Sequence, residues 1–143
     1  VVENLHGPTL SEIEIFGDSS FDFTESLPLK YQAEDPDGIN AVYYTFEHSE
    51  GQSTTIGGPH NSGWKVFNFW LTFGSPPLLG DYLLTQVHLT DSGSSPKETY
   101  YHRDGSVSGD AELSNHSLDL SSLDFTIVEP MFDYTILGGT LIY

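Results

Sequence analysis

The stretch Gly80–Asp91, with the sequence GDYLLTQVHLTD, decides the fold of this chain. Apolar residues alternate along it with a period of two, which is typical of a β-strand with one buried face. The residues of the apolar face, before and after one change of parity, are Tyr82, Leu84, Val87 and Leu89. A change of parity indicates one extra residue, a β-bulge, near Thr85 and Gln86. The alternative is that Leu83 and Leu84 are both buried. Either way, the pattern predicts a central strand.

Other segments show the same alternation and predict further strands at 11–17, 21–23, 27–34, 39–46, 64–73, 97–105 and 123–130. Segment 64–73 is apolar on both faces, whereas 97–105 is polar and is expected at a sheet edge, where charges hinder unwanted pairing. Polar residues at 48–63 and 104–118 predict loops. No segment has helical periodicity over 11 or more residues, so we expect an all-β class and no helix between residues 27 and 90.

Composition narrows the possible partners. The 143 residues suffice for one domain with its own core, and the absence of Cys excludes disulfides and thiol catalysis. A formal charge of −17 opposes binding to nucleic acid and to anionic membrane surfaces. No run approaches the roughly 20 apolar residues that span a bilayer. Such an acidic surface favours divalent cations and a saline or extracellular setting; the alternative is solubility through charge alone.

Four short motifs occur in an order that resembles bacterial immunoglobulin-like (cadherin-like) modules of large secreted and cell-surface proteins. They are DPDGI at 35–39, SGW at 62–64, GDYLL at 80–84 and LTDSG at 89–93. The resemblance covers about residues 11–130 and implies an antiparallel β-sandwich of seven to nine strands. It also implies a tyrosine corner, in which the Tyr82 hydroxyl bonds to the chain just upstream and fixes a crossover between two sheets.

This resemblance also implies a domain organisation. Residues 1–10 are expected to be a linker from a preceding module, 11–130 the sandwich domain, and 131–143 an extension or the start of a following module. The expected role is that of a spacer or adhesion domain without catalysis, at the cell surface or outside the cell. Its expected partners are neighbouring modules of the same polypeptide and a polysaccharide or cell-surface ligand.

Acidic residues gather near one expected turn and predict a calcium site. Calcium takes six to eight oxygen ligands, and clustered carboxylates repel one another unless a cation compensates. The candidate ligands are Glu34, Asp35, Asp37 and Asp91, the last of which ends the central strand. The alternative is an ordinary Asx-type turn with solvated carboxylates.

Aromatic residues predict a second candidate function, carbohydrate binding. Sugar rings stack on exposed aromatic faces, and exposed aromatic clusters mark binding sites. The candidate platform consists of Trp64, Trp70, Tyr43, Tyr100 and Tyr101. The alternative is that these rings pack in the core or under loops.

Catalytic motifs are missing from the sequence. The six His residues are scattered, with no His-Glu-x-x-His pattern for zinc, and no G-x-S-x-G nucleophile motif occurs. Two catalytic carboxylates cannot be selected from 21 acidic residues by spacing alone. We therefore expect no enzymatic activity.

Overall fold

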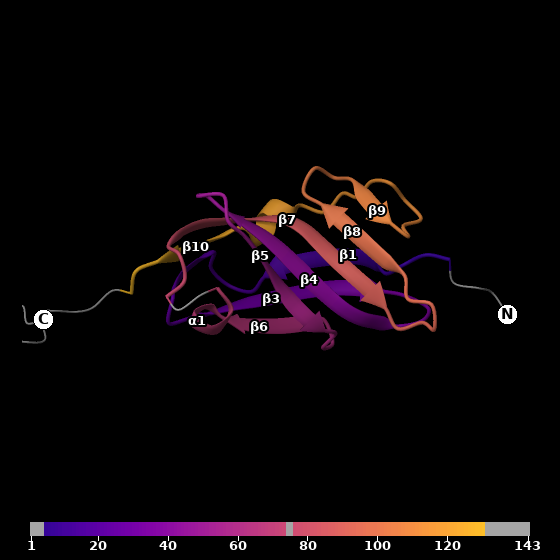
Figure 1. Ribbon diagram of the computed structural model, residues 1–143, viewed down its shortest axis with the longest axis horizontal. Helices are drawn as coiled ribbons and strands as arrows, with labels where there is room; N and C mark the ends of the chain where they lie inside the picture. Colours follow the sequence, from indigo (N-terminus) through magenta and orange to yellow (C-terminus); the bar gives the residue numbers. More distant parts are fainter. Residues whose placement is uncertain (1–4, 74–75, 131–143) are drawn as a thin grey trace, which may run out of the picture.

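The computed structural model describes residues 5–73 and 76–130, without the side chains of Trp70 and Leu71. Nearly all regular structure in this part is β-strand, in two sheets (Figure 1). The smaller sheet has the order β1-β3-β6, with bounds Thr9–Ile15, Ser26–Glu34 and Trp64–Asn68. The larger sheet has the order β2-β10-β7-β4-β5, with bounds Ser20–Asp22, Phe125–Val128, Gly80–Asp91, Ile39–His48 and Ser53–Pro59. In it, β8 (Glu98–His102) pairs with β7 and with β9 (Val107–Gly109). The described helices are all too short to cross a membrane.

Both sheets contribute side chains to one core. The inward faces predicted for the strands at 27–34 and 39–46, now β3 and β4, are confirmed. Their buried residues are Leu27, Leu29, Tyr31, Val42, Tyr44 and Phe46. Alternate residues of a strand point to opposite faces, so the polar residues between them lie outward. The all-β class is therefore confirmed for the described part of the chain.

The central strand β7 contains the predicted bulge. On the neighbouring strand β4, Thr45 lies opposite Gln86 and Phe46 lies opposite Leu84, so Thr85 is the extra residue. The alternative with two adjacent buried leucines is wrong, because Leu83 is 41% exposed. An extra residue shifts the parity by one, and this shift keeps both halves of the strand facing the core.

The edge of β7 that faces away from β4 pairs with two different strands, one on each side of the bulge. Strand β10 pairs with β7 over 80–82, and β8 pairs with it over 86–90. Between them, the Leu84 amide donates to an Asp124 carboxylate oxygen at 2.9 Å, and Arg103 donates to the Leu84 carbonyl at 3.0 Å. Arg103 also forms a two-pronged ion pair with Asp124, at 2.7 and 2.8 Å. This ion pair thus replaces the missing strand hydrogen bonds.

The chain enters β7 through the predicted tyrosine corner. The Tyr82 hydroxyl donates to the Leu78 carbonyl at 2.7 Å, and its ring is 3% exposed. The Nδ1 atom of His48 accepts a hydrogen bond from the Glu50 amide, so the proton of the neutral ring is on Nε2. Nε2 donates to the Leu79 carbonyl at 2.7 Å. Gly80 has φ 119°, a conformation that is strained for other residues, and a Cβ there would lie only 3.1 Å from His48 Nε2, so glycine is favoured at this position. The corner lies where the chain crosses from β6 in one sheet to β7 in the other.

The predicted strand at 64–73 is wrong in its second half. Strand β6 ends at Asn68, and Phe69–Thr72 forms one turn of α-helix, α1, so the expectation of no helix between residues 27 and 90 is also wrong. Phe69 and Phe73 are both buried, and their rings are 5.6 Å apart. A spacing of four places two residues on the same side of either a strand or a helical turn, so the pattern does not separate the two.

Several other expectations about the sheets are corrected. The predicted loops at 48–63 and 104–118 contain β5 and β9, and β8 therefore lies between two strands and not at an edge. The described residues form ten strands, more than the expected seven to nine, and β2 pairs with β10 in parallel. Strand β5 carries one buried apolar side chain, Ile56, so it has no visible alternation. The first strand begins at Thr9, and 131–143 lies outside the described residues.

We expect Tyr82→Phe to lower the free energy of unfolding by about 1 kcal/mol, because the Leu78 carbonyl loses its hydrogen bond. Tyr44 provides a matched control, since its buried hydroxyl has no hydrogen-bond partner within the described residues. Tyr44→Phe should therefore leave stability unchanged or raise it. Urea unfolding of both variants measures the difference, and equal losses would contradict the role of the corner.

Alkaline pH should destabilise the protein through its buried tyrosines. Burial raises the pKa of Tyr44 far above its usual value of about 10, and burial also raises the pKa of Tyr31, Tyr82 and Tyr101. Stability is complete below pH 10 and falls above it, because the unfolded chain releases protons that the folded chain retains. For Tyr44 the slope is about 1.4 kcal/mol per pH unit. Thermal midpoints between pH 8 and 12 test this, and Tyr44→Phe should show a shallower decline.

Candidate functional site

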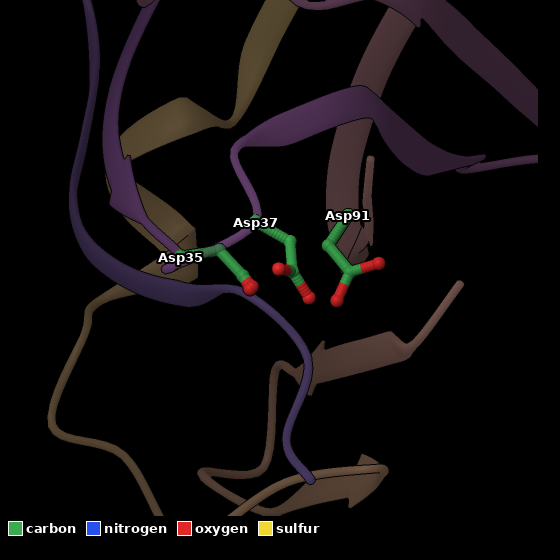
Figure 2. A group of neighbouring side chains, drawn as sticks. All are labelled: Asp35, Asp37 and Asp91. Carbon is green, nitrogen blue, oxygen red and sulfur yellow. The ribbon is translucent and has the colours of Figure 1, made fainter. Parts of the chain in front are cut away.

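Three of the four predicted calcium ligands lie together. Asp35 and Asp37 belong to the turn between β3 and β4, and Asp91 ends β7, so the group joins two loops that are distant in sequence (Figure 2). One carboxylate oxygen from each lies within 4.8 Å of the others. Two oxygens that each lie about 2.4 Å from one calcium ion are at most about 4.8 Å apart. The spacing therefore fits a single calcium ion.

Asp91 is the fixed member of this group. Its side chain is buried, at 1% exposed, and Oδ1 accepts hydrogen bonds from the amides of Gly93 at 3.2 Å and Lys97 at 3.0 Å. The bond to Gly93 forms an Asx turn in the loop that follows β7, and not in the turn at 35–38 for which the alternative was weighed. The carboxylate is not solvated, however, and the loop bonds hold it toward Asp35 and Asp37.

The two loops are tied together beside the carboxylates. The Ser92 amide donates to the Gly38 carbonyl at 3.0 Å, and the Gly38 amide donates to the Asp35 carbonyl at 2.9 Å. A Cβ on Gly93 would lie 2.8 Å from an oxygen of Asp37. A side chain at residue 93 would therefore displace the Asp37 carboxylate from its present position beside Asp91.

Glu34 does not join the other three carboxylates. It is exposed at the end of β3, opposite Thr9 of β1, and lines a shallow groove with Asp35 and His60. Three carboxylates supply between three and six oxygens, so a bound calcium ion would also need carbonyl groups or water. Without a cation, three charges at this separation repel one another, by about 1 kcal/mol per pair in water.

The residues of the predicted aromatic platform do not lie together. Trp64 is 38% exposed on the outer face of the smaller sheet, where Phe16 packs against it. Tyr101 is buried in the core, so its assignment to the platform is wrong. Its hydroxyl accepts the Leu10 amide at 2.9 Å. Trp70 lies in α1 and not on the predicted strand, and its side chain is outside the description.

Tyr43 and Tyr100 lie on the outer face of the larger sheet, with His88 between them. The His88 ring stacks on Tyr100 at 4.2 Å and 8°, and lies 5.6 Å from the Tyr43 ring. Glu98 lies 3.3 Å from His88 and accepts the Tyr100 hydroxyl at 3.2 Å. Stacked rings cover each other's faces, so this row stabilises the sheet and offers little open ring surface.

Sequence reasoning missed Phe16 and His88 as members of aromatic surfaces. Phe16 follows the last residue of β1, and its amide donates to the Pro28 carbonyl at 3.1 Å. Because this bond continues the pairing of β1 with β3, strand register could have placed Phe16 near Trp64. His88 alternates with Val87 and Leu89 on the central strand, so its outward direction was available from the pattern.

Comparisons of the chain with protein-family models, with curated proteins and with solved structures found no match. The candidate site is therefore assigned from its geometry and chemistry.

Two substitutions of Asp91 separate its structural role from its charge. We expect Asp91→Ala to lower the free energy of unfolding by about 1–3 kcal/mol, because the amides of Gly93 and Lys97 lose their acceptor. Asp91→Asn keeps an oxygen acceptor and should retain most of the stability. Unfolding in urea with calcium removed measures both variants. Equal destabilisation would show that the negative charge, and not the acceptor, holds the loop.

Proposed function

We propose that this chain is a non-catalytic, immunoglobulin-like β-sandwich module of a modular extracellular protein. It acts as a spacer and adhesion domain, and calcium stiffens one of its ends. The convergence of Asp35, Asp37 and Asp91 carries the proposal. A fold alone does not define a function, so the argument depends on this group of carboxylates.

The position of the group supports a role at a junction. The described chain enters the domain at one end and leaves it at the other (Figure 1). Thr9, the first residue of β1, pairs with Glu34, next to Asp35. The carboxylates therefore lie at the end where the chain enters, and a preceding module would attach there. A cation at this end would restrict the angle between the two modules.

The fold supports an immunoglobulin-like module in two respects. Two sheets share one core, and the tyrosine corner fixes the crossover into the central strand.

Calcium should raise thermal stability. Binding adds about 2.7 kcal/mol when free calcium is 100-fold above the dissociation constant, a rise of about 5–10 °C in the melting midpoint for a chain of this size. We expect Asp37→Asn to abolish the rise, whereas Glu34→Gln, outside the group, should retain it. Differential scanning calorimetry with calcium and then with excess chelator provides the measurement.

Sodium chloride and magnesium at matched ionic strength serve as controls, because a chain with a charge of −17 also gains stability from screening. A melting curve that is the same in calcium and in chelator would eliminate the calcium role. A rise of equal size in Asp37→Asn would show that calcium acts elsewhere on the surface.

A further inference from the structure

The outer face of the β1-β3-β6 sheet carries an exposed apolar surface that the calcium proposal does not use. Its exposed members are Phe16, Trp64 and Val66, at 63%, 38% and 53%. The register explains why they meet. On β3, Pro28 pairs with Val66 and bonds to Phe16, while the next outward residue, Lys30, pairs with Trp64. Phe16 and Trp64 are therefore diagonal neighbours across β3, with Pro28 beside them. We call these four residues the aromatic patch.

The two rings of the aromatic patch remain open to a ligand. Their centroids are 5.3 Å apart and their planes make an angle of 77°, so the edge of one ring meets the face of the other. This contact occupies one face of one ring, and the two residues are 63% and 38% exposed to solvent. The Tyr43–His88–Tyr100 row on the opposite sheet differs, because His88 and Tyr100 stack face to face. Exposed ring faces attract the C–H groups of a sugar ring through the negative charge at the face.

Polar groups suited to sugar hydroxyls flank the aromatic patch. Lys30 lies in the row next to Phe16 and pairs with Glu14 at 3.6 Å, with both side chains more than half exposed. Gln32 follows on the same face of β3, and Asn68 on the same face of β6. A few hydrogen-bonding side chains around an apolar centre provide orientation without burying a charge.

Charge selects among the possible occupants of the aromatic patch. A second copy of the chain, an acidic protein or an anionic polysaccharide would be repelled by the charge of −17. A basic partner would be attracted to the acidic surface in general, and the patch, where Lys30 is paired with Glu14, gives it no preferred position there. An uncharged polymer with apolar ring faces and many hydroxyls is not repelled by this net charge.

We propose that the aromatic patch binds a neutral polysaccharide, with sugar rings stacked on Phe16 and Trp64 and hydroxyls bonded to Lys30, Gln32 and Asn68. This inference is independent of the calcium proposal, because the patch and the carboxylates share no residue. The aromatic patch lies on the exposed outer face of a sheet, so the ligand is an extended chain or a polysaccharide surface and not a small enclosed sugar.

A binding assay with defined glycans tests the inference. The purified protein is mixed with cellulose, chitin, xylan, β-1,3-glucan and starch, with alginate as the anionic control, and depletion and calorimetry measure affinity. We expect binding to at least one neutral glycan and none to alginate. Phe16→Ala and Trp64→Ala should each weaken that binding about tenfold or more. Trp64→Phe, which keeps a ring face, should lose less.

Matched variants distinguish the patch from other surfaces. Leu83→Ala removes an exposed apolar side chain from the other sheet and Tyr100→Ala disrupts the stacked row; both should bind as the parent protein does. Asp37→Asn should also bind normally, so failure of the calcium proposal leaves this result unaffected. Melting midpoints confirm that each variant is folded. Absence of binding to every neutral glycan, or loss in Tyr100→Ala without loss in Trp64→Ala, would overturn the inference.

Discussion

The backbone N–H and C=O groups of strand β7 need hydrogen-bond partners on both edges of the strand. On one edge, the neighbouring strand changes from β10 to β8 along its length. Strand β10 ends its pairing at Tyr82 and β8 begins at Gln86, so the bulge falls in the interval without a strand partner. The Arg103–Asp124 ion pair fills that interval with charge-assisted hydrogen bonds to Leu84. The hydrogen bond to Asp124 raises the pKa of Arg103. A buried backbone group without a partner would cost about 1–3 kcal/mol, and this contact avoids that cost at Leu84.

The tyrosine corner lies at the start of β7, and the group of three carboxylates lies at its end. Tyr82 and His48 hold two consecutive carbonyl groups where the chain passes between the sheets. At the other end of the same strand, Asp91 organises its loop and faces the turn between β3 and β4. One rigid strand thus connects the crossover to the carboxylates. A cation bound there would act on an element that extends through the whole core.

The two candidate binding surfaces use different physical properties of the domain. The carboxylates come from two loops, and the proposed calcium ion would relieve the repulsion among them. The aromatic patch lies on a regular sheet, where strand register fixes the position of each side chain. Sites on regular elements are held more firmly than sites on loops. Calcium would therefore change the stiffness of one end of the domain, while the aromatic patch would keep its shape with or without the ion.

The sequence by itself determined the strands with one buried face, because alternation depends on neighbouring residues. It offered a bulge near Thr85 and Gln86 as one of two alternatives and suggested the tyrosine corner by resemblance, and the structure decided both. The sequence also identified Asp35, Asp37 and Asp91, since the carboxylates were expected at strand ends. Only the tertiary structure showed that Glu34 lies apart from that group and that Tyr101 is buried in the core. It also showed that Phe16 packs against Trp64. It also decided that β5, with one buried apolar side chain, is a strand. The physical reason is that alternation sets the face on which a side chain lies, whereas contacts between distant segments depend on how strands pair and cross.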